Sequence, residues 1–507
     1  MKTTRRGFLG HSAALPLAPL AFGTSLPLAG QASAATPDTE DYRAIVCVFM
    51  HGGNDHDNTI VPMDSANFAS YQLYRGSLAY HANELKIGGN DIRVANNQIL
   101  TNVYGGPARP LSQMTLVGAG QVARNASLDG RQFSLSPTLS SLYSKYQSGK
   151  LAVLLNIGTL VQPMIKSKFY DRQVKRPPQI GSHNDQTAYW QSGGIEGFSV
   201  GWGGRIGDII ASQNDRPAFT CISVSGNTVL LAGREVLQYQ VKEGGLLDFT
   251  PLRTAFGSDT VGNALGQLIT DTELTPQQMM GREHARITTR AIDSGDQLRE
   301  ALALTPESAM FPPSQPFTAG LKNSTSGLGR QLAMVARVIH ARKHLGLKRQ
   351  VFFVSIGNFD NHSGLAGVHP TQTQTVADAM SAFHDWSVYA GLGNNVTTFT
   401  GSEFGRQIVS NGNGSDHGWG SHQLVLGGAV NGGHVYGIAP SFVSTQSTRF
   451  ENNDHLYTSG VLIPTTPVDQ LAAQLATWMG VADAADMLPH LANFSQQPDP
   501  LQGLLQA

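Results

Sequence analysis

Four polar loops in the sequence carry residue types that bind metals or act as nucleophiles. Asp416 and His417 lie in one of them, a loop rich in glycine and asparagine. A carboxylate supplies charge, an imidazole supplies a nitrogen ligand, and neighbouring glycines let the backbone come close. An isolated Asp-His-Gly tripeptide is more often a surface turn. The pair becomes informative because three other segments also run from an apolar stretch into a polar loop.

The first of these segments, 43–50, is a continuous apolar run that predicts a strand buried on both faces. It leads into a loop with Asp55, flanked by His51, His56 and Asp57. Because α/β folds bind ligands at the carboxyl ends of parallel strands, Asp55 is predicted to bind a metal. A purely turn-forming role for Asp55 is equally compatible with the sequence.

Two further strands deliver similar loops. Residues 350–357 predict a buried strand that leads to Asp360 and His362, a carboxylate and an imidazole that can serve one metal. Residues 396–400 predict the next strand, which leads to Arg406. The planar guanidinium of Arg406 is suited to binding an oxyanion, or else it pairs with Glu403 or another neighbouring acid.

Ser182 has two interpretations. Asp185 and Gln186 fit the first turn of a helix, so Ser182 is predicted either as the helix N-cap or as a nucleophile. A hydroxyl bound to a metal loses its proton more easily, and a helix N-terminus stabilises the resulting anion. Carboxylates and imidazoles around a hydroxyl nucleophile suit phosphoryl or sulfuryl transfer.

At these residues the sequence resembles the uncharacterised bacterial family DUF1501. The shared motifs are short, and glycine-rich or polar: Gly52-Gly53-Asn54-Asp55, Arg75-Gly76-Ser77-Leu78, Ser182-His183, Phe359-Asp360-Asn361-His362, Ser402-Glu403-Phe404-Gly405-Arg406 and Asp416-His417-Gly418-Trp419-Gly420. That family resembles the alkaline phosphatase and sulfatase superfamily. The resemblance implies a doubly wound α/β fold around one or two divalent metal ions, which would be Zn, Mn, Mg or Ca.

The resemblance also implies roles for individual residues. Asp55 matches the first metal-binding aspartate, Asp360 with His362 matches the pair for one metal, and Asp416 with His417 matches the pair for the other. Ser182 matches the nucleophile.

Two departures from the family pattern leave alternatives open. The usual Asp-x-x-x-His spacing is shortened here, so His369 is an alternative to His362. A third, distant histidine ligand is not evident. His422, which we include in the predicted set, and His434 are the candidates.

The expected fold is α/β, with a doubly wound, mostly parallel central sheet and helices on both faces. Residues 35–507 are predicted to form a single domain, with a helical insertion at about 255–345 where Gln, Glu, Arg and Ala are frequent. Hydrophobic residues make up 40% and charged residues only 14% of the chain, which indicates a globular protein with an ample core. Cys47 and Cys221 lie in apolar runs and are predicted to be buried free thiols, although one disulfide would fit an oxidising compartment.

The N-terminus predicts export. Arg5 and Arg6 form a twin-arginine signature, a mildly apolar stretch follows, and Ala32-Ser33-Ala34 resembles a cleavage site. Residues 1–34 are therefore predicted to be a signal peptide recognised by the twin-arginine export machinery. The mature protein is expected in the periplasm or outside the cell, without a stable membrane anchor. No basic run appears, so nucleic acid is not an expected partner.

Together these features predict an exported metal-dependent hydrolase that acts on phosphate or sulfate esters, of a small molecule or a polymer, with Ser182 as nucleophile. The alternative is a non-catalytic cell-envelope protein that keeps the fold and at most a structural metal. A third interpretation is a metal hydrolase in which water, not serine, attacks some other bond.

Overall fold

Strand β1 (Arg43–Met50) lies at the centre of the fold. It pairs in parallel with β13 (Arg349–Ile356) on one side and β14 (Val396–Gly401) on the other. All of its residues after Arg43 are buried. The apolar runs at 43–50, 350–357 and 396–400 therefore form the strands that the sequence predicts.

A computed structural model describes residues 41–116, 130–171, 174–194, 198–246, 257–270, 279–443, 450 and 453–506. The predicted signal peptide at 1–34 lies outside these residues. The described residues belong to one compact unit, Pro37–Ala507. Among their helices, none is long and apolar enough to cross a membrane.

The central sheet is mixed. Its strand order is β12-β11-β13-β1-β14-β15-β10-β16, and β19 also pairs with β10. The strands not yet given are β10 (Leu151–Gly158), β11 (Cys221–Ser223), β12 (Tyr239–Gln240), β15 (Ser421–Gly427), β16 (Val435–Gly437) and β19 (Thr466–Pro467). Strand β15 runs antiparallel to both β14 and β10, whereas the other pairs are parallel.

The prediction of a mostly parallel sheet is therefore corrected to a mixed α/β sheet. The reason lies in the connection after β14. The loop at 402–420 turns the chain back without a crossover helix, so the next strand returns antiparallel beside β14. A strand that is buried on both faces has the same apolar pattern in either direction, so the sequence alone does not reveal this reversal.

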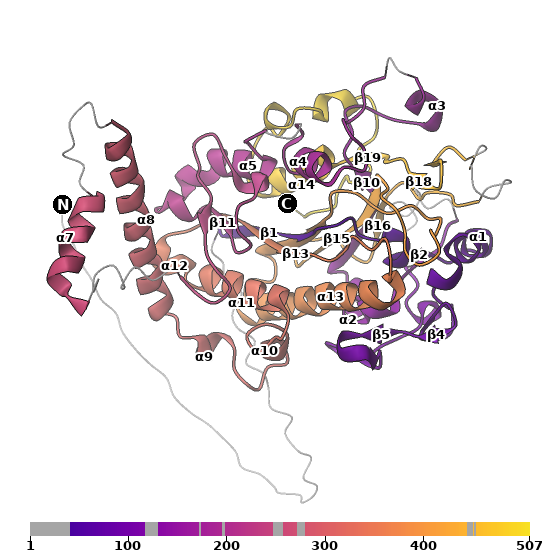
Figure 1. Ribbon diagram of the computed structural model, residues 1–507, viewed down its shortest axis with the longest axis horizontal. Helices are drawn as coiled ribbons and strands as arrows, with labels where there is room; N and C mark the ends of the chain where they lie inside the picture. The colour runs from indigo at the N-terminus through magenta and orange to yellow at the C-terminus, as the bar shows by residue number, and fades with distance from the viewer. Residues whose placement is uncertain are drawn as a thin grey trace, which may run out of the picture. The chain divides into compact units, whose positions relative to one another are not determined.

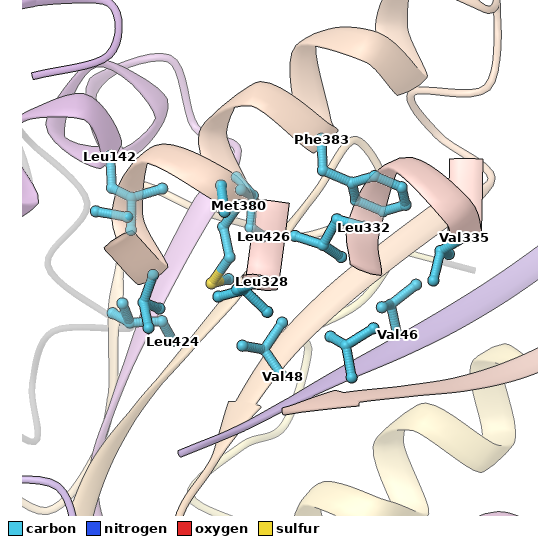
Figure 2. Packing of buried hydrophobic residues seen from close by; sticks show 14 of the residues in the cluster. Val46, Val48, Leu142, Leu328, Leu332, Val335, Met380, Phe383, Leu424 and Leu426 are labelled. Carbon is cyan, nitrogen blue, oxygen red and sulfur yellow. The ribbon is translucent and has the colours of Figure 1, made fainter. Parts of the chain in front are cut away.

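Helices cover both faces of the sheet (Figure 1). One face carries α2 (Ser140–Gln147), α11 (Gly327–His340) and α13 (Leu365–Tyr389). Val46 and Val48 of β1 pack into this layer, against Leu332 among others (Figure 2). Successive side chains of a strand alternate between faces, so Ile45, Cys47 and Phe49 point the other way.

The opposite layer consists of α4 (His183–Ser192), α5 (Trp202–Ile210) and α14 (Val468–Trp478). Its core contains Trp190 and Trp202 beside the odd-numbered side chains of β1. Cys47 and Cys221 are both buried and free, as their apolar surroundings predict. Burial on both faces explains why the central strands are continuously apolar.

The remaining elements lie outside these layers or at their ends. The other helices are α1 (Ser65–Arg75), α3 (Lys166–Phe169), α7 (Asp259–Thr270), α8 (Met279–Ala303), α9 (Glu307–Met310), α10 (Phe317–Gly320) and α12 (Arg342–Leu345). Helices α7 and α8 occupy the region of the predicted insertion, whereas α11 belongs to the layer on the sheet. Short paired strands join β2 (Ile60–Pro62) to β9 (Phe133–Leu135) and β17 (Leu456–Tyr457) to β18 (Val461–Leu462). The small hairpins are β3 (Lys86–Ile87) with β4 (Asn90–Asp91), β5 (Arg93–Val94) with β6 (Gln98–Ile99), and β7 (Asn102–Val103) with β8 (Gly106–Pro107).

Candidate metal centre

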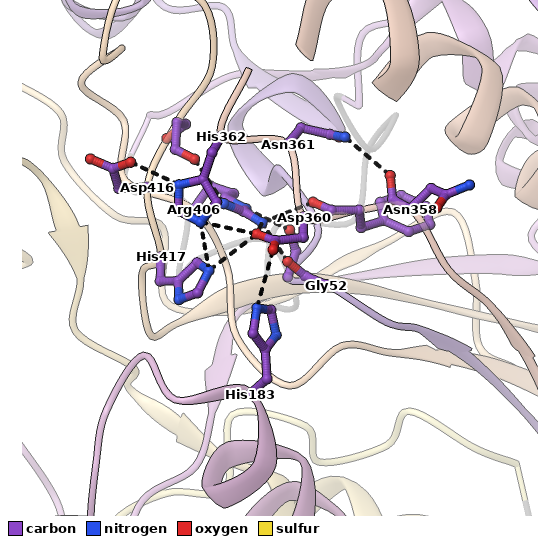
Figure 3. A network of polar contacts seen from close by, with 12 residues as sticks. Gly52, His183, Asn358, Asp360, Asn361, His362, Arg406, Asp416 and His417 are labelled. Atoms are coloured by element: carbon purple, nitrogen blue, oxygen red, sulfur yellow. Dashed lines mark hydrogen bonds and ion pairs between the residues drawn. The ribbon is translucent and has the colours of Figure 1, made fainter. Parts of the chain in front are cut away.

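Four side chains from three distant segments meet beyond the ends of β13 and β14 (Figure 3). Asp360 and His362 come from the loop after β13, His417 comes from the loop between β14 and β15, and His183 is the first residue of α4. We call these four residues the His-Asp cluster. Three of them were predicted metal ligands, and the fold brings them together.

The cluster is centred on the carboxylate of Asp360. Its Oδ1 atom lies 3.1 Å from Nε2 of His362 and 3.1 Å from Nε2 of His417. Its Oδ2 atom lies 3.5 Å from Nε2 of His183. The side chains of His183, Asp360 and His362 are between 37% and 47% exposed, so the cluster opens to solvent.

The other ring nitrogen of each histidine already has a hydrogen-bond acceptor. His183 Nδ1 lies 2.9 Å from Oε1 of Glu403, and His362 Nδ1 lies 3.0 Å from Oδ1 of Asp416. His417 Nδ1 lies 2.6 Å from the carbonyl oxygen of Gly181. In the tautomer that donates from Nδ1, each of these histidines directs Nε2 towards Asp360. Metal-binding histidines are commonly oriented in this way.

These donors fit a divalent metal ion. Nε2 of His362 and Nε2 of His417 are only 2.9 Å apart, close enough to share one proton or one cation. Ligand atoms about 2.0–2.2 Å from one tetrahedral zinc ion lie about 3.3–3.6 Å from each other. The ligand atoms of His183, Asp360 and His417 also lie within 4.8 Å of one another. The residue set and its spacing therefore suit one metal.

The surroundings shift the pKa values of the cluster in different directions. The hydrogen bond to Glu403 raises the pKa of His183. Burial is the main factor that lowers the pKa of His417, which favours its neutral form. Burial tends to raise the pKa of Asp360, but the hydrogen bond and the positive charge of Arg406 outweigh it and lower that pKa to about 2. The hydrogen bond from His362 similarly lowers the pKa of Asp416. Both carboxyl groups are therefore ionised at neutral pH.

Arg406 holds the loops of the site together. It is fully buried, and it donates to the backbone carbonyls of Gly52, Gly53, Phe359 and Ser415 as well as to the carboxylate of Asp360. Its donors therefore point at the protein rather than at an oxyanion in the open site. Of the two predicted roles, the geometry matches pairing with an acid, and that acid is Asp360.

Ser182 lies at the edge of the cluster, as the N-cap of α4. One neighbour, His183, belongs to the cluster. The other, Gly181, contacts the cluster through its carbonyl oxygen, which lies 2.6 Å from Nδ1 of His417. Its Oγ makes no bond to the helix backbone and instead donates to Oδ2 of Asp185 at 2.7 Å. A serine hydroxyl bound to a carboxylate has a ready acceptor for its proton.

The structure places two other predicted ligands elsewhere, in the protein interior. Asp55 is 1% exposed and forms an ion pair with the fully buried Arg75, which neutralises its charge. His422 packs against His56 with ring centroids 4.9 Å apart, and its Nδ1 accepts the backbone N–H of Asn156 at 3.1 Å. Asp55 is therefore already paired with arginine, and His422 makes an edge-to-face ring contact in the interior. Neither residue completes the His-Asp cluster.

The alternative histidines also lie outside the cluster. His369 is buried in α13 and its Nε2 contacts the side-chain oxygen of Asn54 at 3.0 Å. His434 is buried just before β16. The shortened Asp360-x-His362 spacing therefore places His362, and not His369, beside Asp360.

Sequence reasoning missed His183 and Glu403 as parts of the site. His183 stands directly after the predicted nucleophile, which is the signal that could have identified it. Glu403 is 2% exposed and accepts hydrogen bonds from His183 and from the backbone N–H of Gly52 at 2.7 Å. Because the Glu403 side chain is buried behind the histidine, its role depends on three-dimensional contacts alone.

The fold and the cluster define a mixed α/β protein with a polar site at one end of its sheet. Residues 42–491 match the model of a family described as "Protein of unknown function (DUF1501)", and the chain belongs to this family. No curated protein matches the chain. A solved structure titled "Crystal structure of Ps i-CgsB in complex with k-i-k-neocarrahexaose" is similar with a TM-score of 0.33 and 9% identity, over 91% of this chain and 78% of that chain. A likeness this low carries no functional weight.

Replacing Glu403 by glutamine should weaken metal binding without removing a ligand. The change removes the charge that orients His183, and such substitutions typically cost about 10–100-fold in metal affinity. Competition with a fluorescent chelator measures the dissociation constant. Glu84→Gln, which alters an exposed carboxylate paired with Lys86, is the matched control and should leave the constant unchanged. Equal metal affinity in the wild type, Glu403→Gln and Glu84→Gln would contradict this role of Glu403.

The interior histidines should make the fold less stable in acid. Burial lowers the pKa of His56 and of His369 from 6.5 to about 4. Below pH 6.5 the unfolded chain gains protons that the folded chain does not, so stability falls until the pH reaches about 4. The loss is roughly 1.4 kcal/mol for each unit of pKa shift. Urea unfolding of chelator-treated protein between pH 7.5 and 4.5 measures it.

His369→Gln should flatten this pH dependence, because glutamine can still donate to Asn54 but does not titrate. An unchanged slope in the variant would show that His369 does not resist protonation in the folded state.

Proposed function

We propose that the protein is an exported metal-dependent hydrolase of phosphate or sulfate esters, with Ser182 as its nucleophile. The observation that supports it best is the convergence of the Nε2 atoms of three histidines on the carboxylate of Asp360. One of these histidines, His183, directly follows Ser182 in the chain. His183, Asp360, His362 and His417 would hold the metal.

The donor set favours one ion over two. Asp55, the expected ligand of a second metal, is neutralised by Arg75, and Asp416 supports His362. Three imidazoles and one carboxylate suit Zn or Mn better than Mg or Ca, which prefer oxygen ligands. When bound, such an ion supplies Lewis-acid stabilisation of the negative charge on the transferring group.

The protein's own residues would carry out the proton transfer and orient the reactants. Ser182 Oγ attacks the phosphorus or sulfur atom and passes its proton to Asp185, to which it is already bonded. The bond to the leaving oxygen breaks, and Asp185 passes the proton to that oxygen, so the alcohol leaves neutral. The N-terminus of α4 favours the negative charge that develops on the transferring group. Water then cleaves the seryl ester and releases phosphate or sulfate. Glu403, Asp416 and Gly181 keep the three imidazoles in place throughout.

The proposal has two further parts, export and the relation to a superfamily. The twin-arginine signature and the cleavage site support export to the periplasm or beyond by the twin-arginine machinery. The position of the site, beyond parallel strands of a sheet covered by helices on both faces, is compatible with the resemblance to the alkaline phosphatase and sulfatase superfamily. The buried Asp55–Arg75 pair is a departure from that pattern.

Ser182→Ala tests the nucleophile. We expect the metal-loaded variant to lose at least about a thousandfold in turnover of 4-nitrophenyl phosphate or sulfate, with its metal content unchanged. Asp185→Asn should lose about 10–100-fold, because the serine keeps its position but lacks the proton acceptor. Ser212→Ala, at an exposed serine, is the matched control.

Two other results would contradict the serine nucleophile or the hydrolase assignment. Near-normal turnover by Ser182→Ala would exclude the serine nucleophile and favour attack by water. Folded, metal-loaded wild-type protein that hydrolyses no ester would overturn the hydrolase and leave a non-catalytic protein of the cell envelope.

A further inference from the structure

A pocket of about 560 Å³ adjoins the His-Asp cluster. It shares His183 and Glu403 with the cluster, and its wall continues along the first turns of α4 and the end of β13. Its size falls within the range of about 300–1,000 Å³ that is usual for small-molecule sites. A molecule bound in this pocket would have one end at the candidate metal ligands.

Apart from His183 and Glu403, which the pocket shares with the cluster, the polar side chains that line it are uncharged. They are the amides of Asn184 and Asn358, the hydroxyl of Thr187 and the imidazole of His51. No lysine or arginine lines the pocket within the described part of the chain. Its one carboxylate, Glu403, is almost fully buried and already bonded to Gly52 and His183. The pocket therefore lacks the cations that a second phosphate or carboxylate of a ligand would require.

Several of these polar side chains have unused hydrogen-bond donors and acceptors. In the described residues, the side chains of His51, Asn184 and Asn358 have no hydrogen-bond partner. The ring of His51 packs on Phe49 with centroids 4.7 Å apart, which fixes its orientation. Burial is the main factor that lowers the pKa of His51, so the neutral ring offers one donor and one acceptor. These groups can serve a ligand.

The backbone at Asn358 fits a functional role. Its φ angle is +66°, in the left-handed region that non-glycine residues seldom adopt, directly after Gly357. Its carbonyl accepts a hydrogen bond from the side chain of Asn361 at 3.1 Å, which stabilises this conformation (Figure 3). Strained backbone of this kind is concentrated at ligand sites, although it does not by itself define one.

Between these polar groups lie the apolar side chains of Ala188 and Val229 and two glycines. Neutral hydrogen-bonding groups around a small apolar surface match a compound with several hydroxyl groups on a hydrocarbon ring. A lipid tail would need a continuous apolar wall, and a nucleotide polyphosphate would need cations. On this basis we propose that the pocket binds the alcohol portion of the substrate and that this alcohol is an uncharged carbohydrate. The inference rests on the proposed esterase function of the neighbouring centre.

The test compares three leaving alcohols on the same protein. The substrates are methyl, glucose 6- and glycerate 3-monoesters, each of phosphate and of sulfate. Methanol is too small to fill the pocket, and glycerate carries a carboxylate into it. We expect wild-type protein to have its highest kcat/KM with the glucose ester and its lowest with the glycerate ester.

The double variant His51→Ala, Asn184→Ala should lower the ratio of kcat/KM for glucose ester to that for methyl ester about tenfold, mainly through KM for the glucose ester. Two lost hydrogen bonds to neutral groups account for a change of this size. Asn90→Ala, in the exposed hairpin of β3 and β4, is the control and should leave the ratio unchanged.

An unchanged ratio in the double variant, or a wild-type preference for the glycerate ester, would overturn the carbohydrate pocket while leaving the hydrolase intact. If wild-type protein hydrolyses none of the six esters, the proposed function itself fails and the pocket assignment fails with it.

Discussion

The buried guanidinium of Arg406 is the constraint on which the candidate site depends. A charge with no access to water must be balanced and hydrogen-bonded by the protein. Here its acceptors come from three separate loops, those after β1 and β13 and the one between β14 and β15. Because the same cation fixes Asp360, the ligand at the centre of the cluster is oriented before any metal binds.

The polar residues at this end of the sheet divide into two groups with different surroundings. In the exposed group, the Nδ1 atom of every histidine faces an oxygen atom, and its Nε2 atom faces Asp360. In the interior group, Asp55 is balanced by Arg75, and burial raises the pKa of Asp57 well above its usual value. Burial also lowers the pKa of His422 well below its usual value. The first group suits cation binding, and the second suits a neutral interior.

Much of the fold could be predicted from the sequence, because strands covered by helices on both faces must be apolar throughout. The runs that became β1, β13 and β14 have this pattern. The direction of β15 has no such signal. Within the site, Asp360, His362 and His417 follow predicted strands, so their proximity follows from the fold.

What the sequence could not supply were the partners of each polar side chain. Asp55 has the same setting in the sequence as Asp360, at the end of a central strand. Only the structure shows that Arg75, twenty residues later, neutralises it. Likewise, the orientation of His183 depends on Glu403, which is 220 residues away along the chain. Such pairings depend on tertiary packing, which leaves no local pattern.

The most direct test of this account is the metal content of the purified protein, compared with that of His417→Ala. We predict about one equivalent of a divalent transition metal in the wild type and its loss from the variant, with both proteins folded by circular dichroism. Folded wild-type protein that contains no metal, and takes up none when zinc or manganese is added, would contradict the account.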